Sequence, residues 1–320
     1  MKASIQTMAL AISALSTTTS ARAIFKRADA AEAASVGYAT QNGGTTGGGS
    51  TAATEVTSLS ALQDCASQDG PAVCIVSGTI SGADTVKVTS DKTILGADSS
   101  AILKGVGLTI KGVSNVIVRN LSIDKVLADN GDAIGINEAT NVWIDHCDVQ
   151  GDFTQDDKDL YGGLCDVTHA ADWISITNNY FHNHWKASLV GHSDNNGDED
   201  TGHLTVTYAN NYFYDINSRG PSFRFGTGHI FNNYYEKMND AINTRLGAQL
   251  LVESNQFVDV EKPLYAVGDD GFAVSNDNDF GSGENTAAAG DASVPYEYTL
   301  LGSAAVKAAV VGTAGATLTF

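Results

Sequence analysis

A short asparagine-led repeat constrains the fold of this chain more than any other sequence feature. Five triplets begin with asparagine and continue mostly with aromatic residues, and their asparagines lie 32, 22, 22 and 23 residues apart: Asn179, Asn211, Asn233, Asn255 and Asn278. Each triplet follows a short run rich in Val, Ile, Thr or Tyr, which is typical of a strand. A period of about 22 residues in an all-β pattern predicts a solenoid whose coils stack into long parallel sheets.

The repeat extends upstream and is interrupted by insertions. Residues 116–120 and 142–146 resemble the same strand element with different turn residues. Spacings of 32 residues indicate inserted loops near residues 150–163 and 192–202, and loops carried on a rigid scaffold often bear function. We expect the asparagines to adopt left-handed turn geometry and to hydrogen-bond to neighbouring coils, a structural role.

The predicted fold is therefore all-β, a single-stranded right-handed parallel β-helix. A β-sandwich of hairpins is the alternative, but hairpins give no reason for a register of about 22 residues. Ser58 and the apolar spacing after it predict a short N-terminal capping helix over residues 58–64. The preceding segment, residues 41–50, has the glycine-rich composition of a flexible linker.

The four cysteines form two pairs with different expectations. Cys65 and Cys74 would close a short loop if they were bridged. Cys147 and Cys165 lie in strand-like segments and are equally consistent with a disulfide and with buried thiols. Both pairs would meet an oxidising environment if the chain is secreted.

The first residues have the features of a secretion signal. Lys2 precedes the apolar stretch 5–15, and Ala21-Arg22-Ala23 has the small-x-small form of a cleavage site. The expected organisation is a signal peptide, a short pro-segment and a single β-helix domain, over residues 1–23, 24–27 and 28–320. We therefore expect a secreted, extracellular protein.

The net charge limits the partners of the mature chain. The full sequence carries a formal charge of −19, and removing residues 1–27 deletes four basic and no acidic residues, which gives −23. This balance argues against nucleic acid and against an anionic membrane as partners. An anionic ligand would have to be met by a local basic cluster or through a cation. We expect a monomer.

Three ordered motifs closely resemble the secreted pectate lyases, nearest in sequence to those of fungi. They are NVWIDH at residues 141–146, HNHWKASLVGH at 182–192 and RGPSFRFG at 219–226, and the resemblance runs from the region of Gly37 to the C-terminus. The resemblance implies a calcium-dependent β-helix enzyme of plant cell-wall pectin degradation. Its substrate would be de-esterified α-1,4-polygalacturonate (pectate), cleaved by β-elimination to 4,5-unsaturated oligogalacturonides.

The same resemblance implies roles for five residues. Asp132 and Asp166 match positions that bind Ca²⁺, Lys186 and Arg224 match positions that hold substrate carboxylate, and Arg219 matches the catalytic base. The chemistry is consistent, because removal of the C5 proton develops negative charge beside the C6 carboxylate, and cations stabilise that charge. A guanidinium is almost always protonated in proteins, so a base of this kind predicts neighbouring cations and an alkaline optimum.

Aligning the repeats predicts how these residues stack. The alignment places Val167, Gly191 and Phe225 in one column, with Asp166, Val190 and Arg224 in the adjacent column, at about 4.8 Å per coil. One departure concerns Gly162, since the family has an acidic calcium ligand four residues before the position of Asp166. We expect weaker calcium binding by about one to two decades, which Gly162→Asp would reverse unless Asp157 or Asp159 fills the position.

Other functions make different demands on the sequence. A pectin lyase acts on methyl-esterified pectin without calcium, and Asp132 and Asp166 argue against it. A polygalacturonase needs paired carboxylates placed for acid and base roles. A wall-polysaccharide-binding β-helix without activity would explain Gly162, but Lys186, Arg219 and Arg224 argue against such decay. The histidines lack the ligand spacing of a zinc site.

Overall fold

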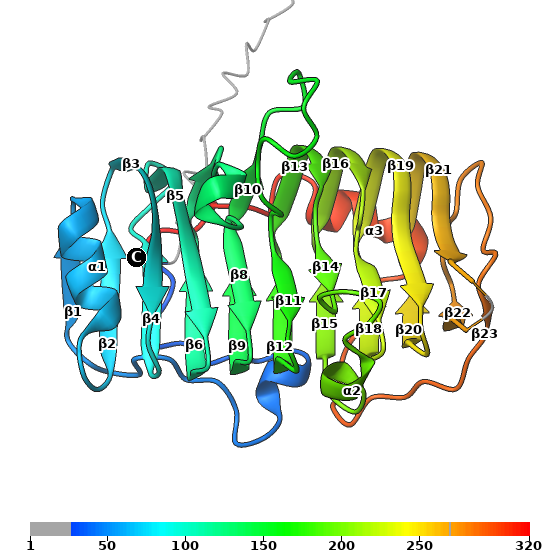
Figure 1. Ribbon diagram of the computed structural model, residues 1–320, viewed down its shortest axis with the longest axis horizontal. Coiled ribbons are helices and arrows are strands. Elements are labelled where there is room, and N and C mark those ends of the chain that lie inside the picture. Colours follow the sequence, from blue (N-terminus) through cyan, green and yellow to red (C-terminus); the bar gives the residue numbers. More distant parts are fainter. Residues whose placement is uncertain (1–26, 269) are drawn as a thin grey trace, which may run out of the picture.

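A computed structural model describes residues 27–268 and 270–320. The predicted signal peptide, residues 1–23, and all but the last residue of the predicted pro-segment lie outside the described residues. Within them the chain winds into a parallel β-helix (Figure 1), and every pairing between its strands is parallel. The predicted fold class is confirmed. None of the helices in this part of the chain is long and apolar enough to span a bilayer.

One strand of nearly every coil joins the first sheet, which runs the length of the solenoid. Its strands follow one another in sequence order: β1 (Ala53–Val56), β2 (Ala72–Val76), β4 (Lys92–Gly96), β6 (Ser114–Arg119), β9 (Thr140–Asp145), β12 (Asp172–Thr177), β15 (Thr205–Ala209), β18 (Thr227–Phe231), β20 (Gln249–Glu253), β22 (Phe272–Asn276) and β23 (Ala288–Ala289).

The second sheet contains two rows of short strands, joined by long strands that belong to both. The lateral row consists of β7 (Ser122–Asp124), β10 (Asp148–Gln150), β13 (Tyr180–Lys186) and β16 (Tyr212–Ser218). The groove row consists of β8 (Ile134–Asn137), β11 (Asp166–Thr168), β14 (Leu189–Val190) and β17 (Ser222–Arg224). The long strands are β3 (Thr79–Val88), β5 (Ile102–Lys111), β19 (Tyr234–Arg245) and β21 (Gln256–Ala266).

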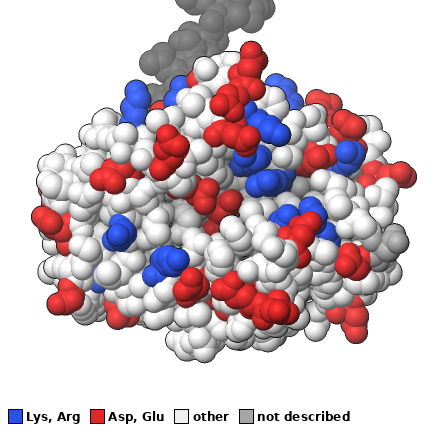
Figure 2. Space-filling model, viewed as in Figure 1, with Lys and Arg blue, Asp and Glu red and all other residues white. Residues whose placement is uncertain are grey.

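Two insertions flank the groove row, close to the positions that the spacing predicted. The first connects β10 to β11 and projects from one edge of the solenoid (Figure 1). The second connects β14 to β15, contains the short helix α2 (Gly197–Asp200) and lies at the opposite edge. Figure 2 shows the face between them, where basic and acidic side chains gather near the middle of the solenoid.

Helices outside these insertions pack against the solenoid. Helix α1 (Leu59–Ser67) forms where Ser58 predicted a helix, and the Ser58 hydroxyl accepts a hydrogen bond from the Ala61 N–H at 3.2 Å. A disulfide between Cys65 and Cys74 joins this helix to β2. Helix α3 (Ser303–Val310) covers Tyr234, and the 3₁₀ turns η1 and η2 span Tyr38–Thr40 and Ala128–Asn130.

The asparagine of each triplet forms a buried ladder along the turn that enters the lateral row. Asn211 shows the pattern: its Oδ1 accepts the Asn179 N–H at 2.9 Å, and its Nδ2 donates to Asn233 Oδ1 at 2.9 Å. The same contacts continue to Asn255 and Asn278, so the structural role is confirmed. The expected left-handed geometry belongs to the preceding residue, such as Asn210 with φ 57°, because the corner falls one residue earlier.

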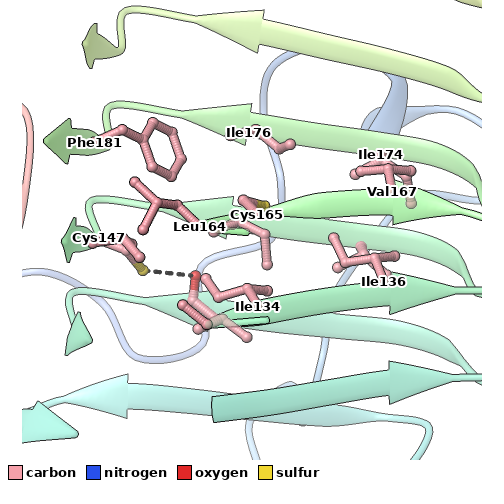
Figure 3. Packing of buried hydrophobic residues seen from close by; sticks show 14 of the residues in the cluster. Ile134, Ile136, Cys147, Leu164, Cys165, Val167, Ile174, Ile176 and Phe181 are labelled. Atoms are coloured by element: carbon pink, nitrogen blue, oxygen red, sulfur yellow. Dashed lines mark hydrogen bonds between the residues drawn. The ribbon is translucent and has the colours of Figure 1, made fainter. Parts of the chain in front are cut away.

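The third residue of each triplet points into the solenoid and stacks on its neighbours. Phe181, Phe213, Tyr235 and Phe257 have successive ring-centroid distances of 5.2, 4.9 and 4.5 Å. Cys147 and Cys165 lie in the same core among apolar side chains (Figure 3), and both are free thiols. Burial raises the pKa of Cys147 to about 12, as expected for an inert buried thiol.

The glycine-rich segment over residues 41–50 is packed and is not a flexible linker. Asn141 Nδ2 donates to the carbonyl oxygens of Gln41 and Gly44 at 2.9 and 3.2 Å. A Cβ at Gly47 would lie 2.2 Å from Thr93 Oγ1. The linker prediction is therefore wrong, because these glycines allow the backbone to approach the first sheet closely.

Candidate active site

Four of the five predicted site residues lie at the edge where the groove-row strands begin. Asp132 lies two residues before β8, Asp166 opens β11, Lys186 lies three residues before β14 and Arg219 three residues before β17. Because these strands are parallel and stacked at about 4.8 Å, their starting ends share one edge of the sheet. The β-helix therefore brings together side chains that are up to 87 residues apart in the sequence.

Arg224 lies elsewhere, and the predicted alignment is partly wrong. The register places Val167 opposite Val190 and Val190 opposite Phe223, so the alignment is off by one residue on the third coil and by two on the fourth. The cause is that the connections between the lateral-row and groove-row strands differ in length: residues 187–188 join β13 to β14, whereas residues 219–221 join β16 to β17. The repeat spacing did not resolve this difference. Arg224 consequently lies at the far end of β17, in register with Arg245 on β19.

The acidic pair consists of Asp132, which is partly buried, and Asp166, which is buried, and each carboxylate is only partly hydrogen-bonded. The Gly163 N–H donates to Asp132 Oδ1 at 2.8 Å, and the Leu189 N–H donates to Asp166 Oδ1 at 2.9 Å. Burial raises the pKa of Asp132, and burial together with the negative charge of Asp132 raises the pKa of Asp166 well above its usual range. The positive charges of Arg219 and Lys186 oppose both shifts, so all four groups lie within electrostatic reach of one another.

The acidic pair fits part of a calcium shell. The Oδ2 of each carboxylate has no hydrogen-bond partner among the described residues, and carboxylate oxygens are the ligands that Ca²⁺ prefers. The pair supplies at most four of the roughly six to eight oxygens that the ion takes. In the described part of the chain no cluster of three or more His, Cys, Asp or Glu side chains could hold a metal. Water and substrate would have to supply the other ligands.

Gly162 does not offer a place for the missing acidic ligand. A Cβ there would lie 2.0 Å from the Gly131 carbonyl oxygen and 2.9 Å from the Asp132 Cα. The expected benefit of Gly162→Asp therefore rests on a wrong premise, because backbone from the neighbouring coil fills the space. Asp157 and Asp159 on the β10–β11 insertion were the alternative calcium ligands. In the structure Asp159 bonds to Lys186, and Asp157 Oδ1 accepts the Asp159 N–H at 2.9 Å.

The two basic residues at this edge differ in their partners. The Lys186 ammonium forms an ion pair with Asp159, whose side chain is 64% exposed on the β10–β11 insertion. Arg219 has a left-handed backbone, with φ 69°, and its carbonyl accepts the Ser188 N–H at 2.8 Å. Its guanidinium takes part in no ion pair or hydrogen bond with the described residues. Arg219 is thus held by its backbone while its charged group is left available.

A second basic cluster, which sequence reasoning found only in part, lies at the far end of the groove row. Asp194, on the β14–β15 insertion, accepts from Arg224 Nε at 2.7 Å and pairs with Arg245 Nη2 at 2.6 Å. The Arg224 Nη1 also donates to the Gly191 carbonyl at 3.1 Å. Arg245 follows Arg224 by 21 residues, so the repeat itself could have identified it.

His184 is a further residue that sequence reasoning did not assign. Its Nδ1 accepts the Lys186 N–H at 2.9 Å, and its ring packs against Gly151, where a Cβ would lie 2.2 Å from His184 Cδ2. Burial lowers the pKa of His184 to about 4, so the ring is neutral near pH 7. Its position two residues before Lys186 suggests a role in positioning that lysine and the base of the first insertion.

Comparisons with known proteins identify the family of this chain. A family model described as pectate lyase matches residues 12–318. Pectate lyase A of Aspergillus niger is 61% identical over 297 residues, covering 92% of this chain and 91% of the relative. Pectate lyase A of Emericella nidulans is 55% identical over 298 residues, covering 92% and 90%.

Solved structures share the whole fold. Pectate lyase Bsp165PelA from Bacillus sp. N165, in complex with trigalacturonate, is 29% identical with a TM-score of 0.79, over 88% of this chain and 98% of that one. A pectate lyase bound to a hexasaccharide is 20% identical with a TM-score of 0.79, over 92% and 99%, and supports the fold alone. The chain belongs to the pectate lyase family, a family of polysaccharide lyases.

Proposed function

We propose that this enzyme cleaves de-esterified α-1,4-polygalacturonate by calcium-dependent β-elimination outside the cell. The observation that carries the proposal is the placement of Arg219 within electrostatic reach of the Asp132 and Asp166 carboxylates, of which Asp166 is buried and Asp132 partly buried. Its guanidinium forms no ion pair or hydrogen bond with the residues that the structure describes. Carboxylates whose pKa is raised by burial, with cationic side chains beside them, are typical of a catalytic site. The predicted signal peptide supports an extracellular location.

Each residue has a defined task in this proposal. Arg219, in its neutral form, accepts the proton from C5 of a galacturonate residue, and the electrons of that C–H bond form the C4–C5 double bond. The bond from C4 to the glycosidic oxygen breaks, and that oxygen takes a proton from solvent. Lys186 and Arg224 hold substrate carboxylates, which requires the substrate to displace Asp159 and Asp194 from them. Asp132 and Asp166 would hold Ca²⁺, which when bound would neutralise charge developing at the C6 carboxylate.

Ultraviolet absorbance of the unsaturated product tests this proposal. The enzyme should generate that absorbance from polygalacturonate in calcium, and a chelator should abolish it reversibly. Equal activity on methyl-esterified pectin in chelator would instead support a pectin lyase. New reducing ends without absorbance would support a hydrolase, and binding without cleavage would support an inactive wall-binding protein.

A further inference from the structure

Tyr208 interrupts an aliphatic column inside the solenoid. It lies on β15, where the strand register pairs it with Ile176 on β12 and Ile230 on β18. The column continues through three more apolar residues: Val118, Ile144 and Val252. Tyr208 is fully buried in this core, and Figure 3 shows its neighbour Ile176 among other apolar side chains. A buried hydroxyl is costly unless it is hydrogen-bonded, so the partner of Tyr208 indicates why a tyrosine is present here.

The partner of Tyr208 is Ser188, which belongs to the opposite side of the core. Ser188 lies directly before β14 of the groove row and is also fully buried. The Tyr208 hydroxyl oxygen lies 2.7 Å from Ser188 Oγ, and the Ser188 hydroxyl donates its one proton to the Cys165 carbonyl. Tyr208 is therefore the donor to Ser188. Burial raises the pKa of Tyr208 well above its usual range, so the hydroxyl keeps the proton that it donates.

Ser188 is bonded to the two coils that carry the proposed base and one of the acids. Its N–H donates to the Arg219 carbonyl at 2.8 Å, and Arg219 has a left-handed backbone with φ 69°. Its hydroxyl bonds to Cys165, the residue before Asp166, and the N–H of the next residue, Leu189, bonds to Asp166 itself at 2.9 Å. Left-handed geometry is unfavourable for a residue other than glycine and persists where the surroundings fix it. One buried serine thus connects the backbone of Arg219 to that of Asp166.

Tyr235 provides a contrast within the same core. It is also fully buried, and it lies within electrostatic reach of Tyr208. Its ring belongs to the aromatic stack, but its hydroxyl has no hydrogen-bond partner among the described residues. The two tyrosines therefore differ in whether the hydroxyl is bonded to the groove row.

We propose that Tyr208 is a positioning residue, which acts through Ser188 to hold Arg219 and Asp166 in fixed places relative to each other. Both Tyr208 and Ser188 are fully buried, so neither touches substrate. The inference rests on the proposed function and adds a support for the site from inside the solenoid. A misplacement of reacting groups by about 1 Å can cost on the order of 10²-fold in rate, so a smaller shift should still be measurable.

Removal of the Tyr208 hydroxyl tests this proposal. Tyr208→Phe should lower kcat on polygalacturonate in saturating calcium about five-fold to twenty-fold. KM should stay within about two-fold, because Lys186 and Arg224 keep their own contacts with His184 and Gly191. A drop in kcat without a rise in KM is not expected from a loss of core packing alone.

The matched control is Tyr235→Phe. It removes a hydroxyl from the same core, but one that has no partner in the described part of the chain, and should leave kcat within about two-fold. Thermal unfolding of both variants establishes that each is folded at the assay temperature.

A double-mutant cycle tests whether Tyr208 acts through Ser188. Ser188→Ala removes the hydroxyl that Tyr208 contacts and should lower kcat at least as much as Tyr208→Phe. The double variant should then have the kcat of Ser188→Ala within about two-fold, because the tyrosine has no other route to the site. If Ser188→Ala does not fold, the comparison of the two Phe variants decides.

Three results would overturn the positioning role. They are an unchanged kcat in Tyr208→Phe, an equal loss of kcat in Tyr235→Phe, and losses that multiply in the double variant. A wild-type enzyme that is inactive on every galacturonan would instead overturn the proposed function, so the two failures are distinguishable.

Discussion

Two rows of polar side chains run along this solenoid: the asparagine ladder and the charged residues at the edge of the groove row. They differ in whether their hydrogen-bonding groups have partners within the protein. In the asparagine ladder the amides of Asn179, Asn211, Asn233 and Asn255 are buried and bonded to the neighbouring coils, as for Asn211. At the edge of the groove row, Asp132 and Asp166 are kept close together although burial opposes their ionisation, and the Arg219 guanidinium has no partner among the described residues. In the ladder each coil supplies the hydrogen-bond partner of the next, whereas the groove-row edge leaves carboxylate and guanidinium groups available to a ligand.

The largest expected effect is at Arg219. Arg219→Lys retains a positive charge but replaces the proposed base, so kcat on polygalacturonate should fall on the order of 10²–10⁴-fold, the usual contribution of a general base. The thermal unfolding midpoint should stay close to wild type, because the Arg219 guanidinium has no hydrogen bond or ion pair to lose within the described part of the chain. A variant that keeps more than a tenth of wild-type turnover would remove Arg219 from the base role.

Substitution in the asparagine ladder should have the opposite effect: it should lower the free energy of unfolding and leave kcat unchanged. Asn211→Ala leaves the Asn179 N–H and the Ile176 carbonyl without their buried partner, which should lower the free energy of unfolding by about 2–4 kcal/mol. Denaturant titration measures this, and kcat of the folded fraction should be unchanged.

Asn239→Ala is the matched control for that variant. Asn239 Nδ2 donates to Asn217 Oδ1 at 2.6 Å across neighbouring coils, but at an exposed position. Its removal should change stability by less than about 0.5 kcal/mol. Equal losses in the two variants would show that burial does not distinguish the ladder from surface pairs.

The sequence predicted the ladder better than the groove, for a physical reason. The regular spacing of the asparagines predicts coils of nearly equal length. The β-helix fold and the stacking of Asn211 on its neighbours follow from that regularity. The groove depends on connections of unequal length, and the alignment therefore misplaced Arg224. The pairing of Asp194 with two arginines depends on how an insertion folds back, for which the sequence has no periodic pattern.

Substitutions at Gly162 test whether this position is restricted by backbone packing or could supply a further calcium ligand to the acidic pair. Gly162→Asp should lower the free energy of unfolding by about 1–3 kcal/mol through overpacking against Gly131, with no gain in calcium affinity. Gly162→Ala introduces the same Cβ without a carboxylate and should lose a similar amount. If the Asp variant alone needs less calcium for half-maximal activity, the loop has room for a ligand and this account of the position is wrong.

The smallest effect concerns Asp194, which pairs with Arg245 and with Arg224, the arginine that we expect to bind substrate. Asp194→Asn keeps the shape but removes the charge, so KM for polygalacturonate should fall about two-fold to five-fold while kcat stays nearly constant. Asp198→Asn, an exposed change in the same insertion, serves as the control. A rise in KM would mean that Asp194 orients Arg224 for binding.

We expect the charged groups at the edge of the groove row to bind calcium and pectate together. Calorimetric titration of trigalacturonate into the Arg219→Lys variant measures this without turnover. The account predicts measurable binding in calcium and at least a ten-fold weaker affinity in chelator, because the acidic pair without Ca²⁺ repels a substrate carboxylate. The same affinity with and without calcium would contradict the account.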